Sequence, residues 1–346
     1  MSAPLDVGDV LEARKGYDAS LAATRSTGRP VWLPLILIGV LLVVPALQLT
    51  GGGYNYVLHM FLLTMMYAAM ASSWNILGGY TGYISLGHNV FFCVGGYFSG
   101  MILAYFGIST IITAPLAGVV AAAVGFLVGL ITLKMRGPTF IISSIALLMV
   151  TRILFDNWRF VGGSNGVTLV PPLSLSAQWM KLPYYYAFLV IMVVTVYAAY
   201  RIKHSKFGLH LRAISQDEVK AESAGIDTRL YKSIAFAISA FFIGMCGAVW
   251  GEYLTYIRPN IFLILLIAAQ MVLMCILGGK GTVAGPIVGA ILLIAFNEAC
   301  VAFLGWSEIN ILGTGLIMVV TLMFFPNGIV GTLAQKKKLP RFLNWD

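Results

Sequence analysis

Charged residues are scarce in this sequence. Of its 346 residues only 10% are charged, whereas a soluble domain carries about a quarter. Hydrophobic residues make up 59% of the chain, and the mean hydropathy is +0.89. This composition excludes a soluble globular protein and predicts an all-α integral membrane protein that crosses the bilayer several times.

Motifs for catalysis and for energy conversion are also missing. The sequence has no GxxxxGK[ST] loop for ATP, no HExxH zinc pair and no GxSxG elbow. It has no arginine-rich voltage sensor, no carbonyl filter and no mid-span ladder of carboxylates for a proton relay. We therefore expect no catalytic residue, and this chain is not expected to be an enzyme. Four cysteines fall inside apolar runs without CxxC spacing and are expected to pack rather than to form disulfides or bind metal: Cys93, Cys246, Cys275 and Cys300.

Long hydrophobic runs are what the sequence does have. A spanning helix needs about 20 mostly apolar residues, and about ten candidates are present: 31–49, 56–77, 86–106, 111–133, 138–155, 184–201, 233–256, 261–279, 283–304 and 309–325. The third is interrupted by Gly95, Gly96 and Gly100. The first 30 residues are polar and lack the apolar run of a secretory signal, so they are expected to form a cytoplasmic tail.

The basic residues lie at the ends of the spans. With the N-terminus inside, all but four of the 22 Lys and Arg side chains fall on the cytoplasmic side, the exceptions being Arg152, Arg159, Lys181 and Arg258. The positive-inside rule then predicts N-in, C-in and an even number of spans. The expected organisation is a tail over 1–30, a transmembrane domain over 31–333 and a basic cytoplasmic tail over 334–346. The net charge of +9 thus reflects membrane topology, and no nucleic acid is expected as a partner.

The loop 201–232 is the longest polar interruption on the predicted cytoplasmic side. Ser215 and Glu218 have the spacing of a capping box, Gly225 can stop a helix in the left-handed conformation, and Asp227 or Thr228 can cap the next helix. The pattern predicts one short cytoplasmic helix of about two to three turns, with small residues on part of its surface. Such a helix is suited to docking into a partner.

Two glycine-rich stretches lie at membrane depth or its edge. The first glycine stretch is 77–87 and is followed by His88 and Asn89; the second glycine stretch is 277–285. Non-helical backbone in a membrane is tolerated where it lines protein or a cavity, so either stretch could form a substrate path. The alternative is that the glycines only allow close helix packing. For the first stretch, with Thr81 and Ser85 beside His88 and Asn89, a path is favoured.

Polar residues inside spans are costly and therefore informative. Gln270 lies mid-span and needs a partner, either another helix or the substrate. Glu252 and Glu298 lie near the outer ends of their spans, where we expect solvated carboxylates. The outward segment 156–183 is rich in turn-forming residues and could dock a partner outside the membrane.

Several blocks of the chain form a series whose order and spacing are informative. They are NILGGYTGYISLGHNVFF, RGPTFIISSIAL, the GGSNG of 162–166, SKFGLHLRAISQDEVKAESAGIDTRLYKSIAFAISAFFIGMCGAVWG, LGGKGTVAGPIVGA and FPNGIVG. Together these blocks resemble the M-type permease subunits of branched-chain amino-acid ABC importers. They cover roughly three quarters of the chain. The sequence departs from the family pattern at Gln270, where members often carry Glu, and at Cys93 and Asn89, where small apolar residues are usual.

The resemblance implies roles for named residues. DEVKAESAGI matches the family's EAA-like coupling motif, which implies contact with an ATPase for Asp217, Glu218, Ala221, Glu222, Ala224 and Gly225. The substrate path would be lined by Gly79, Thr81, Gly82, Ser85, His88, Asn89 and Gln270. A solute-binding protein would dock at Gly162, Gly163, Ser164 and Asn165, near the turn 257–260.

The resemblance also implies partners and a location. These are a paralogous permease, two cytoplasmic ABC ATPases that bind ATP and Mg²⁺, an extracytoplasmic binding protein and the lipid of a bacterial inner membrane. No cofactor is expected in this chain. Three alternatives stay open: an ATPase-independent secondary transporter or channel for a small polar solute, an ABC permease for urea or short amides, and a membrane scaffold without transport.

Overall fold

The computed structural model of the protein describes residues 39, 41–45, 54–135, 137–172, 179–304, 313, 315, 323 and 328–335. By its contacts the chain divides into two units, Met1–Val43 and Val44–Asp346, and the following description concerns the second unit. Of the expected elements, the tail 1–30 lies outside the described residues. The expected spans 31–49 and 309–325 and the tail 334–346 enter them only in short pieces.

Helices account for nearly all regular structure in the described residues. The long helices are α3 (Asn55–Gly78), α4 (Asn89–Phe106), α5 (Thr110–Thr132), α6 (Pro138–Asn157), α7 (Leu182–Lys203), α10 (Thr228–Leu254), α12 (Leu265–Gly278) and α13 (Gly285–Leu304). The short elements are η2 (Arg159–Val161), η3 (Gly163–Asn165), β1 (Val167–Thr168), α8 (Lys206–Gln216), α9 (Glu218–Ser223), β2 (Tyr256–Ile257), α11 (Pro259–Phe262) and α15 (Gly328–Gln335).

The hydrophobic runs between residues 54 and 304 were predicted correctly as helices. Among the described residues, seven helical segments are long and apolar enough to cross a membrane, with α11 and α12 counted together as Pro259–Gly278, and Gly285–Cys300 is a shorter apolar helix. Each overlies one expected span. The protein is therefore a multi-pass, mostly helical membrane protein, whereas the total of about ten spans and the N-in, C-in orientation remain predictions.

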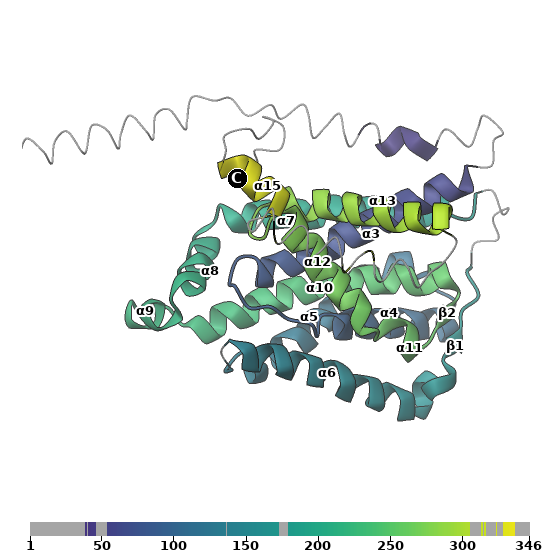
Figure 1. Ribbon diagram of the computed structural model, residues 1–346. Helices are drawn as coiled ribbons and strands as arrows, with labels where there is room; N and C mark the ends of the chain where they lie inside the picture. The colour runs from purple at the N-terminus through teal and green to yellow at the C-terminus, as the bar shows by residue number, and fades with distance from the viewer. Residues whose placement is uncertain are drawn as a thin grey trace, which may run out of the picture. The chain divides into compact units, whose positions relative to one another are not determined.

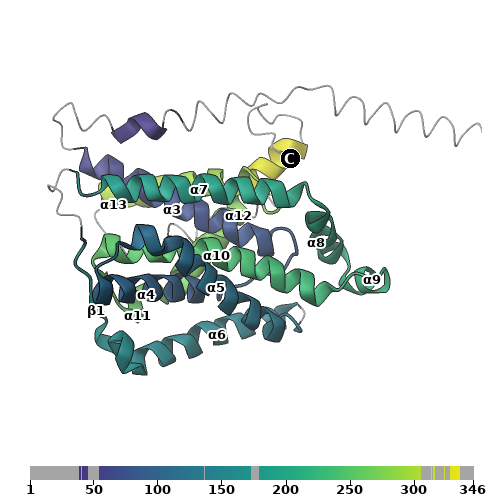
Figure 2. The same cartoon turned by 180° about the vertical axis from the view of Figure 1, so that it is seen from behind.

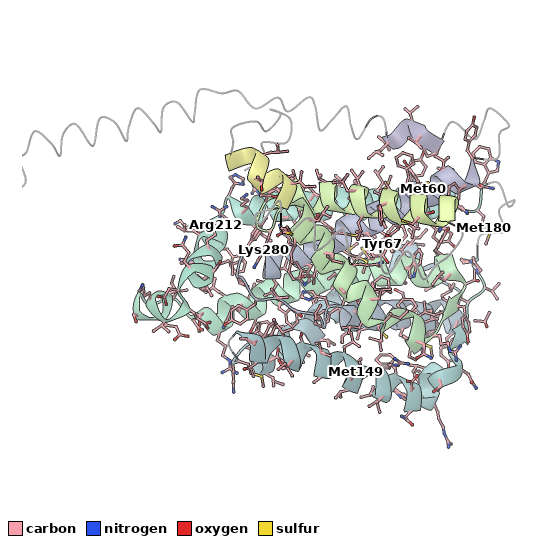
Figure 3. The ribbon with its side chains drawn as sticks, in the orientation of Figure 1. Met60, Tyr67, Met149, Met180, Arg212 and Lys280 are labelled. Carbon is pink, nitrogen blue, oxygen red and sulfur yellow. The ribbon has the colours of Figure 1, made fainter. Side chains whose placement is uncertain are left out.

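Helix α10 lies at the centre of the packing. It packs most extensively against α5 and then α4, while α3 packs against α7, α10 and α13 (Figure 1). Both ribbon views place α8 and α9 at one end of the helices and β1 with β2 at the opposite end (Figures 1 and 2). We call these the α8–α9 end and the β1–β2 end. Arg212 and Lys280 lie toward the α8–α9 end, and Met60 and Met180 toward the other (Figure 3).

The glycines of α4 do not interrupt the helix, contrary to expectation. Helix α4 is continuous, and its glycines are points of close approach: Gly95 and Gly96 to α10, and Gly100 to the side chain of Ile257. A Cβ on Gly95 would lie 2.1 Å from the carbonyl oxygen of Gly244, and a Cβ on Gly247 would lie 2.0 Å from that of Phe92. Backbone meets backbone at both points, so small residues here serve close helix packing.

This crossing gives a stability prediction. Gly247→Ala should lower the free energy of unfolding by about 1–3 kcal/mol, because the new methyl group meets the Phe92 carbonyl and forces α4 and α10 apart. Gly251→Ala is the matched control on the same helix, since its Cβ would meet a side chain, Ile257 Cδ1 at 2.8 Å and Cγ1 at 3.2 Å, while the nearest backbone atom, Gly96 O, would lie 3.7 Å away. Thermal unfolding of the purified protein in detergent measures both. Equal melting temperatures for the two variants would contradict the close crossing.

Glu252 is buried, and the expectation of a solvated carboxylate was wrong for it. Its side chain is fully enclosed at the end of α10. Its oxygens accept hydrogen bonds from Thr110 N at 2.5 Å and Thr110 Oγ1 at 2.7 Å, from Ser109 Oγ at 3.0 Å and from Tyr184 Oη at 3.2 Å. The carboxylate thus binds the N-terminal end of α5, where main-chain N–H groups are free and the helix dipole favours negative charge. Glu298, by contrast, accepts one hydrogen bond from Tyr56 at an exposed position.

Candidate functional site

The connection between α7 and α10 forms two helices, not the single helix that the capping signals predicted. Ser205 caps α8 by accepting a hydrogen bond from Gly208 N. Asp217 caps α9 by accepting from the backbone N–H groups of Val219 and Lys220, both at 3.1 Å. Ser215 lies inside α8, so the predicted Ser215–Glu218 capping box is wrong. The bond from the Lys220 backbone holds the pKa of Asp217 below its ordinary value, because hydrogen bonds to a carboxylate favour its charged form.

The end of α9 follows the prediction. Gly225 has φ +88°, its N–H donates to Glu222 O, and Ile226 N donates to Ala221 O at 3.1 Å. These two bonds are the Schellman motif. Asp227 then caps α10 through Leu230 N at 3.0 Å. The helix α9 is therefore held at both ends by side-chain and backbone caps, although it has only six residues.

Helix α9 has an inner and an outer face. Ala221 is buried within this chain, whereas Glu222, Ala224 and Gly225 are exposed. Val219 is 57% exposed and the Lys220 side chain 86%, so the outer face offers apolar, small and charged groups together. The assignment of this face to an ATPase stays a prediction.

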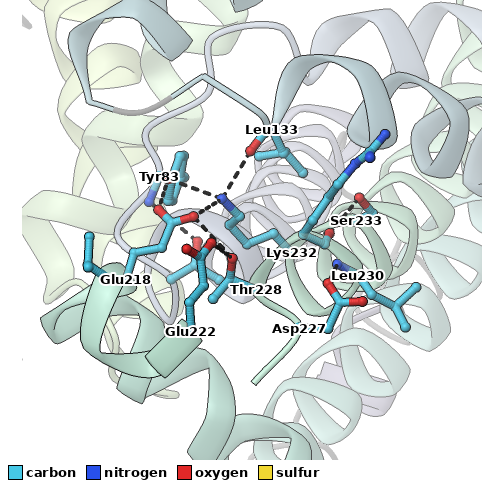
Figure 4. A network of polar contacts seen from close by, with 12 residues as sticks. Tyr83, Leu133, Glu218, Glu222, Asp227, Thr228, Leu230, Lys232 and Ser233 are labelled. Atoms are coloured by element: carbon cyan, nitrogen blue, oxygen red, sulfur yellow. Dashed lines mark hydrogen bonds and ion pairs between the residues drawn. The ribbon is translucent and has the colours of Figure 1, made fainter. Parts of the chain in front are cut away.

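The inner face of α9 meets a buried lysine that the sequence did not single out. Lys232, in the second turn of α10, is 1% exposed. Its Nζ lies 2.5 Å from Glu218 Oε1, 3.2 Å from Tyr83 Oη and 3.0 Å from Leu133 O, so each of its three N–H donors has an acceptor. The Tyr83 hydroxyl donates to the other oxygen of Glu218. We call Tyr83, Leu133, Glu218 and Lys232 the Lys232 network (Figure 4).

The Lys232 network joins four elements. Glu218 belongs to α9, Lys232 to α10, Leu133 follows α5, and Tyr83 belongs to the first glycine stretch. Thr228 extends the network, with its hydroxyl 2.7 Å from Glu222 Oε1 and 3.2 Å from Glu218 Oε1. A close-up shows Tyr83, Glu218 and the Leu133 carbonyl gathered around the Lys232 ammonium group, with Thr228 beside the two glutamates (Figure 4). The network therefore connects α9 directly to the first glycine stretch through Tyr83.

Basic side chains of α10 also bind the last carbonyls of α5. Arg229 donates to Leu130 O from Nε at 3.1 Å and from Nη2 at 2.8 Å, and Lys232 donates to Leu133 O. Cations at a helix C-terminus satisfy free carbonyls and oppose the helix dipole favourably. The α8–α9 end of α5 is thus fixed to α10. Within the described residues no group of three or more acidic, histidine and cysteine side chains could hold a metal ion.

The first glycine stretch is folded into the protein. Thr81, Ser85, His88 and Asn89 are each no more than 2% exposed. The Thr81 hydroxyl bonds Leu77 O, Ser85 O accepts from Trp74 Nε1, and Asn89 Nδ2 donates to Ile264 O at 2.6 Å. His88 lies among aromatic rings, 5.0 Å from that of Phe236.

Gly82 has φ +82°, and a Cβ there would lie 3.6 Å from Ser215 Oγ on α8. Gly79 lies directly against the side chain of Asn75, and a Cβ on Gly79 would lie 1.8 Å from Asn75 Oδ1. Gln270 accepts a hydrogen bond from Tyr67 Oη at 3.1 Å, which joins α12 to α3. The substrate path assigned to these glycines, to Gln270 and to the four buried residues above stays a prediction, because none of the contacts requires a substrate path.

The predicted docking residues lie at the β1–β2 end. Strands β1 and β2 pair antiparallel, Val167 with Ile257 and Thr168 with Tyr256, and this brings the loop 162–166 beside the turn 257–260. Arg258 Nε donates to Ser164 O at 3.1 Å, and the Tyr256 hydroxyl donates to Asn165 O. Ser164 and Asn165 are exposed, and Gly162 and Gly163 are partly so. The two segments that the sequence suggested as one surface are adjacent, while their partner is untested.

Comparison with known families decides what kind of membrane protein this is. Residues 56–324 match the family model of the branched-chain amino acid transport system permease component. The chain belongs to this family. The resemblance drawn from the sequence blocks is therefore confirmed, and the family is one of transport permeases.

Curated relatives agree with this assignment. The chain is 27% identical over 303 residues to the high-affinity branched-chain amino acid transport system permease protein LivM of Escherichia coli K12, covering 80% of this chain and 70% of the relative. It is 24% identical over 289 residues to LivH of the same strain, covering 77% of this chain and 91% of that protein. A probable LivH of Methanocaldococcus jannaschii is 26% identical over 274 residues, which cover 72% of this chain and 83% of the relative. No solved structure matches the chain.

Proposed function

We propose that this chain is the translocating permease subunit of an ATP-driven importer for branched-chain amino acids. One structural observation supports the proposal in addition to family membership. Helix α9 exposes one face, and its other face contacts the Lys232 network. An ATP-driven permease without a nucleotide-binding loop of its own must receive force from another subunit, and a capped helix with one exposed face and one buried face is suited to that task. ATP and Mg²⁺ would be bound by two ATPase subunits, and the path would lie against a paralogous permease.

The orientation proposed is N-in and C-in, in the inner membrane of a bacterium. Lys134, the seven basic residues of 201–232 and Lys280 are all on segments of the α8–α9 end, whereas Lys181 and Arg258 are on segments of the β1–β2 end. The positive-inside rule then supports the α8–α9 end as cytoplasmic. This leaves the loop 162–166 outside, where a binding protein could dock.

The transport step follows as alternating access. Closure of the ATPases would favour one conformation of the permease only if they bind α9 more tightly in that conformation. The Lys232 network would pass the displacement of α9 to the first glycine stretch. Because Thr81, Ser85, His88 and Asn89 are buried in this structure, it corresponds on this proposal to a state in which the path is closed at that stretch.

Docking can be tested at an exposed residue of α9. Ala224→Trp should reduce recovery of the ATPases with the purified permease by about tenfold, because an indole on the outer face keeps α9 from seating in a groove. Val170→Trp is the control, since Val170 is 80% exposed at the β1–β2 end. Affinity purification with quantitative mass spectrometry measures recovery. Equal recovery from both variants would mean that the ATPases bind elsewhere.

The whole proposal is tested by reconstitution. The complex in liposomes should take up labelled leucine, isoleucine or valine only with ATP inside and binding protein outside. Uptake by this chain alone without ATP would identify a secondary transporter. Uptake of urea or short amides in place of these amino acids would keep the mechanism and change the substrate.

A further inference from the structure

The two glycine stretches meet at Asn75. This residue lies in the last turn of α3, and its side chain is fully enclosed. Its Nδ2 donates to Thr282 O at 2.8 Å and its Oδ1 accepts from Gly281 N at 2.9 Å. The amide therefore binds the second glycine stretch as a neighbouring strand would, through one main-chain acceptor and one main-chain donor.

Both glycine stretches are shaped to allow this contact. Gly281 has φ +79°, which presents its N–H to the Asn75 oxygen. A Cβ on Gly281 would lie 3.4 Å from Gly79 O, so the two backbones are nearly in van der Waals contact. Gly79 itself has no room for a side chain above the Asn75 amide. The glycines that were predicted to line a path thus create the close approach that the Asn75 bonds require.

Asn75 lies on a continuous series of contacts that begins at α9. Glu218 of α9 binds Tyr83 of the first glycine stretch, and Asn75 at the base of that stretch binds the second. The second stretch connects α12 with α13, and these two helices pack against each other and against α3. A displacement of α9 can therefore reach α12 and α13 through Tyr83 and Asn75.

We propose that Asn75 is a positioning residue that makes the two glycine stretches move together with α9, so that ATP hydrolysis is coupled to rearrangement of α12 and α13. This inference rests on the proposed function for its coupling step. Its structural half, that Asn75 holds the second glycine stretch against α3, does not depend on any partner.

The test variant is Asn75→Leu. It keeps the approximate shape of the side chain, but it removes both the donor to Thr282 O and the acceptor for Gly281 N, so that these two main-chain groups lose their partner. Ser73→Ala is the matched control. Ser73 is also buried on α3, and its hydroxyl donates to Ser239 O at 2.6 Å on α10, away from the second glycine stretch.

The reactivity of Cys275 measures directly whether Asn75 holds the second glycine stretch against α3. Its Sγ is buried 3.2 Å from Asn75 Oδ1, so it should react with N-ethylmaleimide only when the second glycine stretch opens. With Cys93, Cys246 and Cys300 replaced by Ala, Asn75→Leu should speed alkylation by about tenfold, because the local opening that exposes Cys275 no longer has to break the hydrogen bonds of Asn75. Ser73→Ala should leave the rate unchanged.

The coupling role of Asn75 is tested by the ratio of amino acid taken up to ATP hydrolysed in the reconstituted complex. Asn75→Leu should lower this ratio by about fivefold while hydrolysis continues. A merely structural loss would lower the amount of active complex and leave the ratio unchanged, and that result would overturn the coupling role. Unchanged alkylation of Cys275 would overturn the inference altogether. If the wild-type complex shows no ATP-driven uptake, the proposed function fails, and the alkylation result still decides whether Asn75 holds the stretch.

Discussion

Lys232→Met should abolish ATP-coupled uptake and lower the free energy of unfolding by about 3–5 kcal/mol. The reason is that Glu218, whose side chain is only 12% exposed, would lose the ammonium group that lies 2.5 Å from its Oε1, and removing one partner of a buried ion pair is strongly destabilising. The Leu133 carbonyl would lose its donor as well. Thermal unfolding in detergent measures the first effect, and uptake by the reconstituted complex measures the second.

A double variant separates stability from coupling. Lys232→Met with Glu218→Gln leaves no buried charge, so most of the lost stability should return, within about 1–2 kcal/mol of wild type. Uptake should stay low, because α9 and α10 are no longer joined by an ion pair. Normal uptake by the double variant would show that this ion pair does not transmit the displacement of α9.

The control for an exposed ion pair lies on the same helix. Lys220 Nζ is 3.1 Å from Asp217 Oδ2, but the lysine side chain is 86% exposed. Lys220→Met should therefore change stability by no more than about 0.5 kcal/mol, since water and salt screen such a pair. A large loss here would mean that charge alone, without burial, explains the effect of Lys232.

The spans could be predicted because length and hydropathy determine them. A run such as 111–133 contains no charged side chain, so it can only be buried or face lipid, and α5 occupies Thr110–Thr132. Interruption of α4 was wrongly predicted from Gly95, Gly96 and Gly100. Glycine weakens a helix in isolation, but here α10 packs so closely that a side chain would not fit, and this packing outweighs the propensity.

The division of the loop 201–232 into α8 and α9 could not be predicted from capping signals. Ser215 and Asp217 are both good caps, and the spacing to Glu218 favoured Ser215. In the structure Glu218 turns toward Lys232, a residue 14 positions later, and is not available to Ser215. A tertiary ion pair therefore selects Asp217 as the cap. Family resemblance identified the motif residues, but it did not indicate that Ala221 faces inward.

The burial of Lys232 and Glu252 was not predicted from the sequence. Lys232 was counted among the basic residues of a cytoplasmic loop, and Glu252 was placed in solvent. Their partners are far away in the chain, Tyr83 by 149 positions and Thr110 by 142. A charge near a span end can face water or another helix, and single-sequence patterns do not distinguish the two. The sequence contained one sign of this burial, which was the position of Lys232 within the apolar pattern of α10.

Glu252→Leu should lower the free energy of unfolding by about 3–5 kcal/mol. Without the carboxylate, the backbone N–H and hydroxyl of Thr110 and the hydroxyl of Tyr184 lose their acceptor inside the protein, and each buried unsatisfied group costs about 1–3 kcal/mol. Glu252→Gln should cost less, because one side-chain oxygen remains to accept from Thr110 N. Thermal unfolding in detergent measures both variants.

Glu298→Leu is the matched control at the same end of the protein. Glu298 also accepts a hydrogen bond from a tyrosine, Tyr56 Oη at 2.6 Å, but at an exposed position, so its loss should stay within about 0.5 kcal/mol. If Glu252→Leu were equally mild, the N-terminal end of α5 would not depend on this carboxylate. A large difference would mean that α10 holds α5 by a buried acid at the β1–β2 end, as it does by Arg229 and Lys232 at the α8–α9 end. Fixing α5 to α10 at both ends makes the pair a rigid support against which α9 and the glycine stretches can move.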